Sequence, residues 1–198
     1  MARIDYFLFP ISPFTYLAGD RLEQIATKHQ AEITYKPFDL MKIFAEVDTP
    51  PVGQRHPSKQ SYRLQELRRI AEGNAMEINI QPAHFPTNPA PASAAIIAAQ
   101  EAGGGDVGGL VRSILAACWA EERDVAEDAV LADCLEQNGF SKGLLMSGLL
   151  SGMEAYERNT QEALERGVFG SPFYLVGEEA FWGQDRLEYL DAYLGSLG

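Results

Sequence analysis

The sequence predicts an α/β fold in which a strand unit at each end of the chain encloses a long helical block. Near the N-terminus the predicted order is strand, helix, strand, over residues 6–37. Near the C-terminus it is strand, strand, helix, over residues 173–197, and helical periodicity fills most of the chain between these units. The order βαβ, helices, ββα is that of a thioredoxin-like fold with an all-helical domain inserted between its halves.

The first strand and helix meet at a serine. Residues 6–9 are an apolar, aromatic run too short for a helix, which indicates a buried strand. Ser12 and Pro13 are typical of a helix start, with serine as N-cap and proline at the first helical position. We expect a helix over residues 14–29. Its free N–H groups and positive dipole end predict an anion-binding turn at Ser12 that faces a cleft.

The second strand and the helical block follow. Residues 32–37 alternate and are β-branched, which predicts a strand parallel to the first after a right-handed crossover. Residues 38–53 fit no strand pattern. Two proline-rich patches bracket a polar helix over residues 58–72. Further helices are predicted over residues 92–102, 107–121, 128–137, 143–150 and 153–166.

The C-terminal unit begins with a hairpin. Residues 173–176 and 180–182 are short strands around a turn at residues 177–178. A final helix over residues 185–197 has Asp185 in its first turn. We expect residues 1–40 and 160–198 to form the thioredoxin-like domain. Residues 41–159 would form the inserted helical domain, which packs on it as a wall of a cleft.

Composition and charge exclude several classes of protein. The 28 acidic residues outnumber the 16 basic ones, giving a net charge of −12, so we expect no nucleic-acid partner. No apolar run is long enough to span a membrane and the N-terminus lacks a signal-peptide pattern, so we expect a cytoplasmic protein without membrane contact. Cys118 and Cys134 lie in helical patterns without CxxC spacing, which indicates buried free thiols and no metal site.

Three motifs in combination resemble a known family. Residues 7–18 (FLFPISPFTYLA), 168–176 (VFGSPFYLV) and 181–187 (FWGQDRL) are similar to signatures of the 2-hydroxychromene-2-carboxylate isomerases. These enzymes are related to kappa-class glutathione transferases and share the inserted-helix architecture of DsbA-like proteins. The resemblance covers nearly the whole chain. It implies a cytoplasmic, homodimeric, glutathione-dependent cis–trans isomerase of aromatic catabolism, acting on an anionic aromatic or chromene carboxylate.

The resemblance implies that Ser12 contacts the glutathione sulfur. Its hydroxyl and the helix N-terminus would favour the thiolate, because a free thiol with a pKa of about 8.5 is mostly protonated at neutral pH. The resemblance also implies that Ser171, before a cis Pro172, pairs through its backbone with the cysteinyl part of glutathione. Taken alone, the spacing around Ser12 favours a plain helix N-cap, and Ser171-Pro172 could be a turn before a strand.

The remaining contacts implied by the resemblance involve charged and polar groups. Gln184 and Asp185 would hold the γ-glutamyl group, and Lys59 the glycyl end or an acidic substrate. Taken alone, Asp185 is a first-turn acid and Lys59 a surface lysine. Lys59 follows Arg55 and His56, and an anionic ligand of so acidic a protein needs such local positive charge.

Two places depart from the family's pattern. Asp48-Thr49 stands where an asparagine often precedes a proline pair, and Ala92-Ser93 stands where related chains often carry an arginine. The family's ligand contacts are not carried over there. Among the aromatic residues, Phe181 and Trp182 are expected in the core, and Trp119 in the core or in a cleft wall.

The implied reaction is a reversible addition of the thiolate to an unsaturated carbonyl compound, with bond rotation before elimination. One alternative is a kappa-type glutathione transferase, in which the thiolate stays attached to an electrophile. Another is a non-catalytic module that binds glutathione or a peptide. A thiol–disulfide oxidoreductase is disfavoured, because Ser12 and Thr15 stand where a CxxC pair would be needed.

Overall fold

The two ends of the chain form one mixed sheet in a computed structural model that describes residues 1–197. Gly198, the last residue of the predicted thioredoxin-like domain, lies outside the described residues. The strands are β1 (Arg3–Leu8), β2 (Glu32–Pro37), β3 (Phe173–Val176) and β4 (Glu179–Trp182), in the order β2-β1-β3-β4. β1 is parallel to β2 and antiparallel to β3, which is antiparallel to β4. These pairings confirm the predicted strands.

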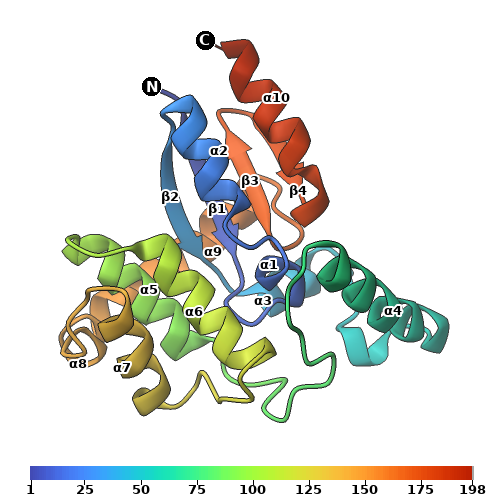
Figure 1. The fold of residues 1–198 in the computed structure, drawn as a ribbon, viewed down its shortest axis with the longest axis horizontal. Helices are drawn as coiled ribbons and strands as arrows, with labels where there is room; N and C mark the ends of the chain where they lie inside the picture. The colour runs from blue at the N-terminus through green and yellow to red at the C-terminus, as the bar shows by residue number, and fades with distance from the viewer. Residues whose placement is uncertain (198) are drawn as a thin grey trace.

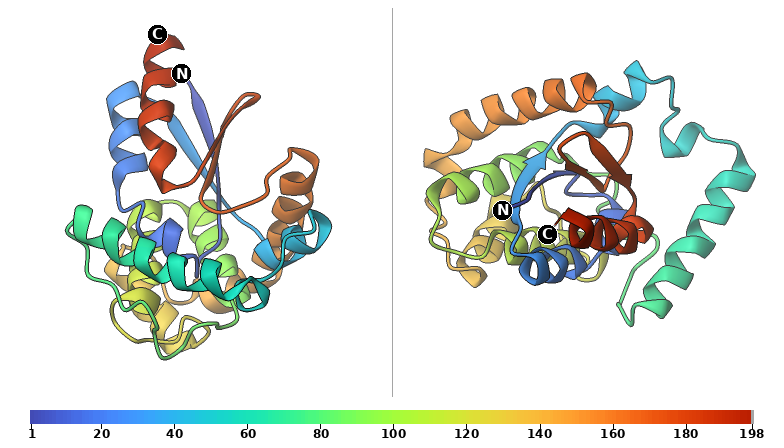
Figure 2. Two further views of the ribbon diagram at one scale, coloured as in Figure 1. Left: turned by 90° about the vertical axis from the view of Figure 1, so that its right-hand side faces the viewer. Right: turned by 90° about the horizontal axis from the view of Figure 1, so that it is seen from above.

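Helices surround this sheet (Figure 1). They are α1 (Pro13–Tyr16), α2 (Arg21–His29), α3 (Leu40–Glu46), η1 (Val52–Gln54), α4 (Pro57–Gly73), α5 (Ala90–Ala102), α6 (Val107–Trp119), α7 (Asp128–Gln137), α8 (Leu144–Ser147), α9 (Leu149–Glu165), η2 (Gln184–Arg186) and α10 (Leu187–Leu197). Figure 2 shows α2 and α10 on one face of the sheet and α9 on the other. The helices α5 to α8 gather at one end of the sheet, and α4 projects to the side.

The predicted first helix over residues 14–29 is wrong, because the chain forms two helices there. A turn at residues 17–20 separates α1 from α2, and Gly19 within it has a φ of 61°. Glycine adopts this left-handed conformation at little cost. Ser12 therefore precedes a single helical turn, and the macrodipole behind it is smaller than that of a long helix. The helix α3 was not predicted.

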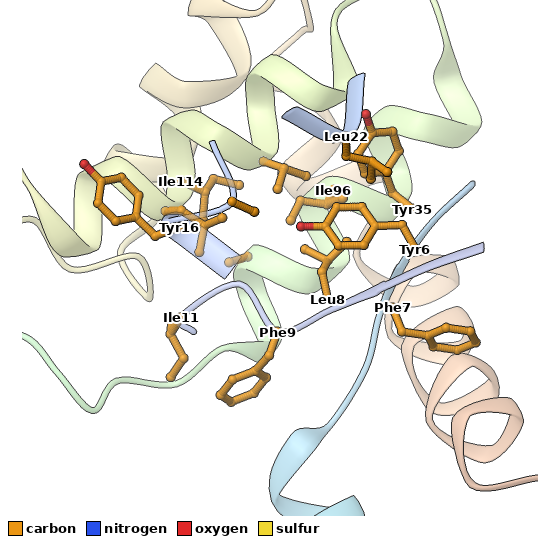
Figure 3. Close-up of a cluster of buried hydrophobic side chains, with 14 of the residues drawn as sticks. Tyr6, Phe7, Leu8, Phe9, Ile11, Tyr16, Leu22, Tyr35, Ile96 and Ile114 are labelled. Atoms are coloured by element: carbon orange, nitrogen blue, oxygen red, sulfur yellow. The ribbon is translucent and has the colours of Figure 1, made fainter. Parts of the chain in front are cut away.

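Alternation along β1 divides the core into two sides. Figure 3 shows Tyr6 and Leu8 pointing toward Ile96 and Phe7 pointing the opposite way. One continuous cluster of buried apolar residues includes these strand residues and residues of the helical block. Ile96 of α5 is 0% exposed. The sheet and the inserted helices therefore share a core.

Several buried residues were predicted from the sequence. Cys118 and Cys134 are buried and free, which confirms that prediction. Trp119 is 0% exposed, and its indole N–H donates to the Ile11 carbonyl at 3.2 Å. This bond ties the turn before Ser12 to the helical block. Within residues 1–197, no helix combines the length and the apolar character needed to cross a membrane.

Candidate active site

A cavity of about 520 Å³ opens beside the start of α1. It lies between the turn after β1, the segment before β3, and the region from α3 to α4. Residues from these segments and from β4 line it, among them Ser12, Arg55, Lys59, Arg63, Ser171 and Trp182. Three of the six site residues predicted from the sequence, Ser12, Lys59 and Ser171, are thus brought to one cavity.

Ser12 caps α1 and also lines the cavity. Its hydroxyl oxygen accepts a hydrogen bond from the Thr15 N–H at 3.3 Å, which confirms the N-cap. The same hydroxyl donates to the Ser171 carbonyl, also at 3.3 Å. Hydroxyl-to-oxygen bonds are usually about 2.7–2.8 Å long, so this proton is weakly held. Capping and donation to a ligand are therefore compatible roles of one side chain.

Ser171 is fixed through its side chain, which leaves its amide free. Its hydroxyl oxygen accepts a hydrogen bond from the Phe9 N–H at 2.8 Å and lies 2.8 Å from the Thr15 hydroxyl. The peptide bond between Ser171 and Pro172 is cis, as predicted. Among residues 1–197, the backbone N–H of Ser171 has no hydrogen-bond partner. This amide is available to pair with an extended peptide-like ligand.

The opposite part of the cavity lining is basic. Lys59 and Arg63 lie one helical turn apart on α4, and Arg55 and His56 precede that helix. Within the described part of the chain, Arg55, Lys59 and Arg63 form no ion pair. Lys59 was predicted from the sequence as a site residue, whereas Arg63 was not. The one signal for Arg63 in the sequence was its position four residues after Lys59. This spacing was not distinctive, because α4 carries many other charged residues.

Gln184 and Asp185 are not among the residues that line the cavity. The Gln184 side chain is buried, and its carbonyl oxygen accepts a hydrogen bond from the Arg21 guanidinium at 2.6 Å. Asp185 is exposed and forms an ion pair with Arg186 at 2.6 Å. Both follow Gly183, whose N–H donates to the Pro172 carbonyl at 2.9 Å. This bond places the two residues next to the segment that carries Ser171.

Trp182 was predicted in the core, and that prediction is wrong. Its side chain is 52% exposed and lines the cavity. It belongs to the edge strand β4 and packs against Phe169, with 4.8 Å between ring centroids. A side chain at Gly170 would collide with its indole. Phe181, the preceding residue, is half-buried, because successive side chains of a strand point to opposite faces.

The two positions that depart from the family's pattern have different places in the structure. Thr49 lines the cavity, whereas Asp48 does not. Ala92 and Ser93 are both 0% exposed within α5, so neither reaches the cavity. Neither side chain is therefore placed to contact a ligand in this cavity.

The two thiols are poor candidates for chemistry at this site. Burial raises the pKa of the Cys118 thiol to about 12 and that of Cys134 to about 11. Neither lines the cavity. Thiol–disulfide exchange requires a thiolate, and the CxxC positions hold Ser12 and Thr15. Among residues 1–197, no group of three or more His, Cys, Asp or Glu side chains is placed to bind a metal ion.

A protein-family model matches almost the full length of the chain. A family model described as a DSBA-like thioredoxin domain matches residues 3–195. The chain belongs to this family. A crystal structure described as that of a "probable DsbA oxidoreductase" from Streptomyces coelicolor shares the fold, with a TM-score of 0.74 and 16% identity over 99% of this chain and 89% of that one.

More similar relatives have a different name. A 2-hydroxychromene-2-carboxylate isomerase of Sphingobium xenophagum is 28% identical over 96% of this chain and 97% of its own length. One from Pseudomonas putida is 27% identical over 98% of this chain and 95% of its own. A solved structure of such an isomerase has a TM-score of 0.80 and 26% identity, covering 98% of this chain and 95% of that one. These matches confirm the resemblance found in the sequence and the DsbA-like thioredoxin fold.

Proposed function

We propose that the protein is a glutathione-dependent cis–trans isomerase of the 2-hydroxychromene-2-carboxylate type. Isomerases of that name match nearly the whole chain at 27–28% identity, which supports an isomerase. The observation that carries the proposal is the meeting of the Ser12 hydroxyl and the Ser171 backbone, 3.3 Å apart, at a cavity whose other wall is basic. A thiol peptide and an anionic substrate would find complementary groups there.

The residues present fit glutathione. The free N–H of Ser171 suits the cysteinyl backbone, and the Ser12 hydroxyl suits the sulfur. Lys59 offers a charge to a carboxylate, and Asp185 offers one to the γ-glutamyl ammonium. Bound glutathione would supply a nucleophilic thiolate for reversible addition to an unsaturated carbonyl substrate.

The protein's own groups would then keep the thiol deprotonated. In the proposed complex the Ser12 hydroxyl gives up its long bond to the Ser171 carbonyl and donates to the sulfur. The Phe14 N–H also has no hydrogen-bond partner among residues 1–197, and Phe14 lines the cavity. Because α1 is one turn long, these two donors matter more than its dipole. Apolar residues such as Phe9 line the same cavity.

Product analysis tests this function against its alternatives. Purified protein would be incubated with glutathione and a panel of chromene carboxylates and unsaturated aryl-pyruvates, and both substrate geometry and glutathione would be quantified by chromatography. We expect a change of geometry with glutathione conserved. Stoichiometric consumption of glutathione would instead indicate a kappa-type transferase. Tight glutathione binding without turnover of any compound would indicate a non-catalytic module. The homodimer and the cytoplasmic location implied by the resemblance stay predictions.

A further inference from the structure

We propose that Arg63, supported by Arg55, binds the carboxylate of the aromatic substrate and so selects aromatic acids over neutral compounds. This inference rests on the proposed function only in calling the ligand a substrate. The subsite itself is a property of the cavity and can be tested without glutathione.

The surroundings of Arg63 suit an anionic ligand. Its side chain is half-buried at the cavity wall, and among residues 1–197 it has neither an ion pair nor a side-chain hydrogen bond. Burying a charge is costly unless it is paired. Burial, and to a smaller extent the charge of Arg55, lowers the pKa of the Arg63 guanidinium. A bound carboxylate would relieve both the desolvation and the repulsion.

Arg55 is held in place beside it. Its Nε donates to the Pro50 carbonyl at 3.0 Å, and its guanidinium lies over the Phe44 ring, 5.4 Å from the centroid. These contacts engage one edge and one face of the guanidinium and involve no acid. The net charge of Arg55 is therefore available to the cavity. Two unpaired arginines in so acidic a protein create a local positive potential that attracts anions.

The lining around the arginines suits an aromatic acid. Phe14, Phe44 and Phe85 line the same cavity, and among residues 1–197 no Asp or Glu lines it. The planar guanidinium of arginine matches a carboxylate with two parallel hydrogen bonds, which a lysine ammonium does not provide. Lys59, an exposed point charge one turn away, is better suited to the glycyl carboxylate of glutathione. The two anions would thus be bound by different side chains of α4.

The test is calorimetric titration, without glutathione, of trans-cinnamate and its neutral isostere trans-cinnamamide. Four proteins are compared: the unmodified chain, Arg63→Gln, Arg63→Lys and Arg68→Gln. Arg68 is an exposed arginine of the same helix that does not line the cavity, so Arg68→Gln removes the same charge elsewhere. A separate titration with glutathione is run on each protein, and thermal unfolding checks that each variant is folded.

We expect Arg63→Gln to raise the Kd of cinnamate about tenfold or more, since a hydrogen bond to a charged group is lost. Arg63→Lys should recover part of the affinity. Arg68→Gln should leave it unchanged, and no variant should alter the weaker binding of cinnamamide or the Kd of glutathione. The proposal is overturned if the unmodified chain does not bind cinnamate, if Arg63→Gln weakens glutathione instead, or if Arg68→Gln matches Arg63→Gln. If the unmodified chain binds cinnamate as expected but does not bind glutathione, the result would contradict the proposed function and not the carboxylate subsite.

Discussion

The hydroxyl oxygen of Ser12 lies 3.3 Å from the carbonyl oxygen of Ser171, although 159 positions separate the two residues in the chain. The antiparallel pairing of β1 and β3 explains this contact, because the segment that leaves β1 lies beside the segment that enters β3. Hydrogen bonds from the Phe9 N–H to the Ser171 hydroxyl, and between the Thr15 and Ser171 hydroxyls, hold the two segments together. The candidate site is therefore built from both ends of the chain.

Ser12→Ala separates capping from chemistry. Loss of the cap should lower the free energy of unfolding by about 0.5–2 kcal/mol. If the hydroxyl also donates to the sulfur, the thiol pKa of bound glutathione should be higher in Ser12→Ala than in the unmodified protein. Each unit of this rise corresponds to about 1.4 kcal/mol of lost thiolate stabilisation. Thiolate ultraviolet absorbance, titrated against pH with saturating glutathione, measures this. Ser151→Ala, at an exposed serine of α9, is the control. Superimposable curves for Ser12→Ala and the unmodified protein would show that Ser12 is only a cap.

Asp185→Asn tests the γ-glutamyl contact. Asp185 is 58% exposed at its side chain and already pairs with Arg186, so we expect a modest loss of glutathione affinity, about two- to fivefold. The dipeptide Cys-Gly lacks the γ-glutamyl group, so its Kd should not change. Calorimetry with both ligands measures this, and Glu188→Gln, at an exposed acid of α10, is the control. Equal loss for both ligands would contradict a contact to the γ-glutamyl ammonium.

The two thiols should resist alkylation in the folded protein. Burial raises the pKa of Cys118 to about 12 and that of Cys134 to about 11. Below these pH values, each cysteine is therefore less often a thiolate than an exposed cysteine would be. Relative to a free thiol with a pKa of about 8.5, the thiolate fraction of Cys118 at pH 8 falls by about a thousandfold. Iodoacetamide labelling at pH 8, read by mass spectrometry in buffer and in urea, checks this. Rapid labelling of the folded protein would reopen a thiol role for these cysteines.

Ile96→Ala should destabilise the sheet and the inserted helices together. Ile96 belongs to α5 but lies in the same buried cluster as Tyr6 and Leu8 of β1 (Figure 3). Truncating a buried isoleucine costs about 2–5 kcal/mol, and Leu150→Ala, at a residue 75% exposed, should cost no more than about 0.5 kcal/mol. Urea unfolding followed by far-ultraviolet circular dichroism and by tryptophan fluorescence should give coincident transitions. Two separate transitions, with only one shifted, would show that the predicted domains unfold independently.

Local signals in the sequence were sufficient for most elements of this fold. Hydrophobic periodicity, turn residues and capping preferences act within a few residues of the chain. They were therefore enough to predict the strand at residues 32–37, the hairpin around residues 177–178 and the N-cap at Ser12. The motifs around Ser12 and Ser171 also pointed to the family. The local pattern did not predict the break between α1 and α2. There Gly19, in a left-handed conformation, interrupts a stretch whose helical pattern is continuous.

Only the tertiary structure decided which of these side chains share a cavity. Arg63 is one of many charged residues on a polar helix. It becomes a candidate substrate-binding residue because α4 places it in the lining of the same cavity as Ser12, and because it forms no ion pair among residues 1–197. Trp182 is large and aromatic, as core residues often are. It is nevertheless exposed to the same cavity, because β4 is an edge strand. In both cases the environment of a side chain depends on elements distant in the sequence, and those long-range contacts leave no trace in local periodicity.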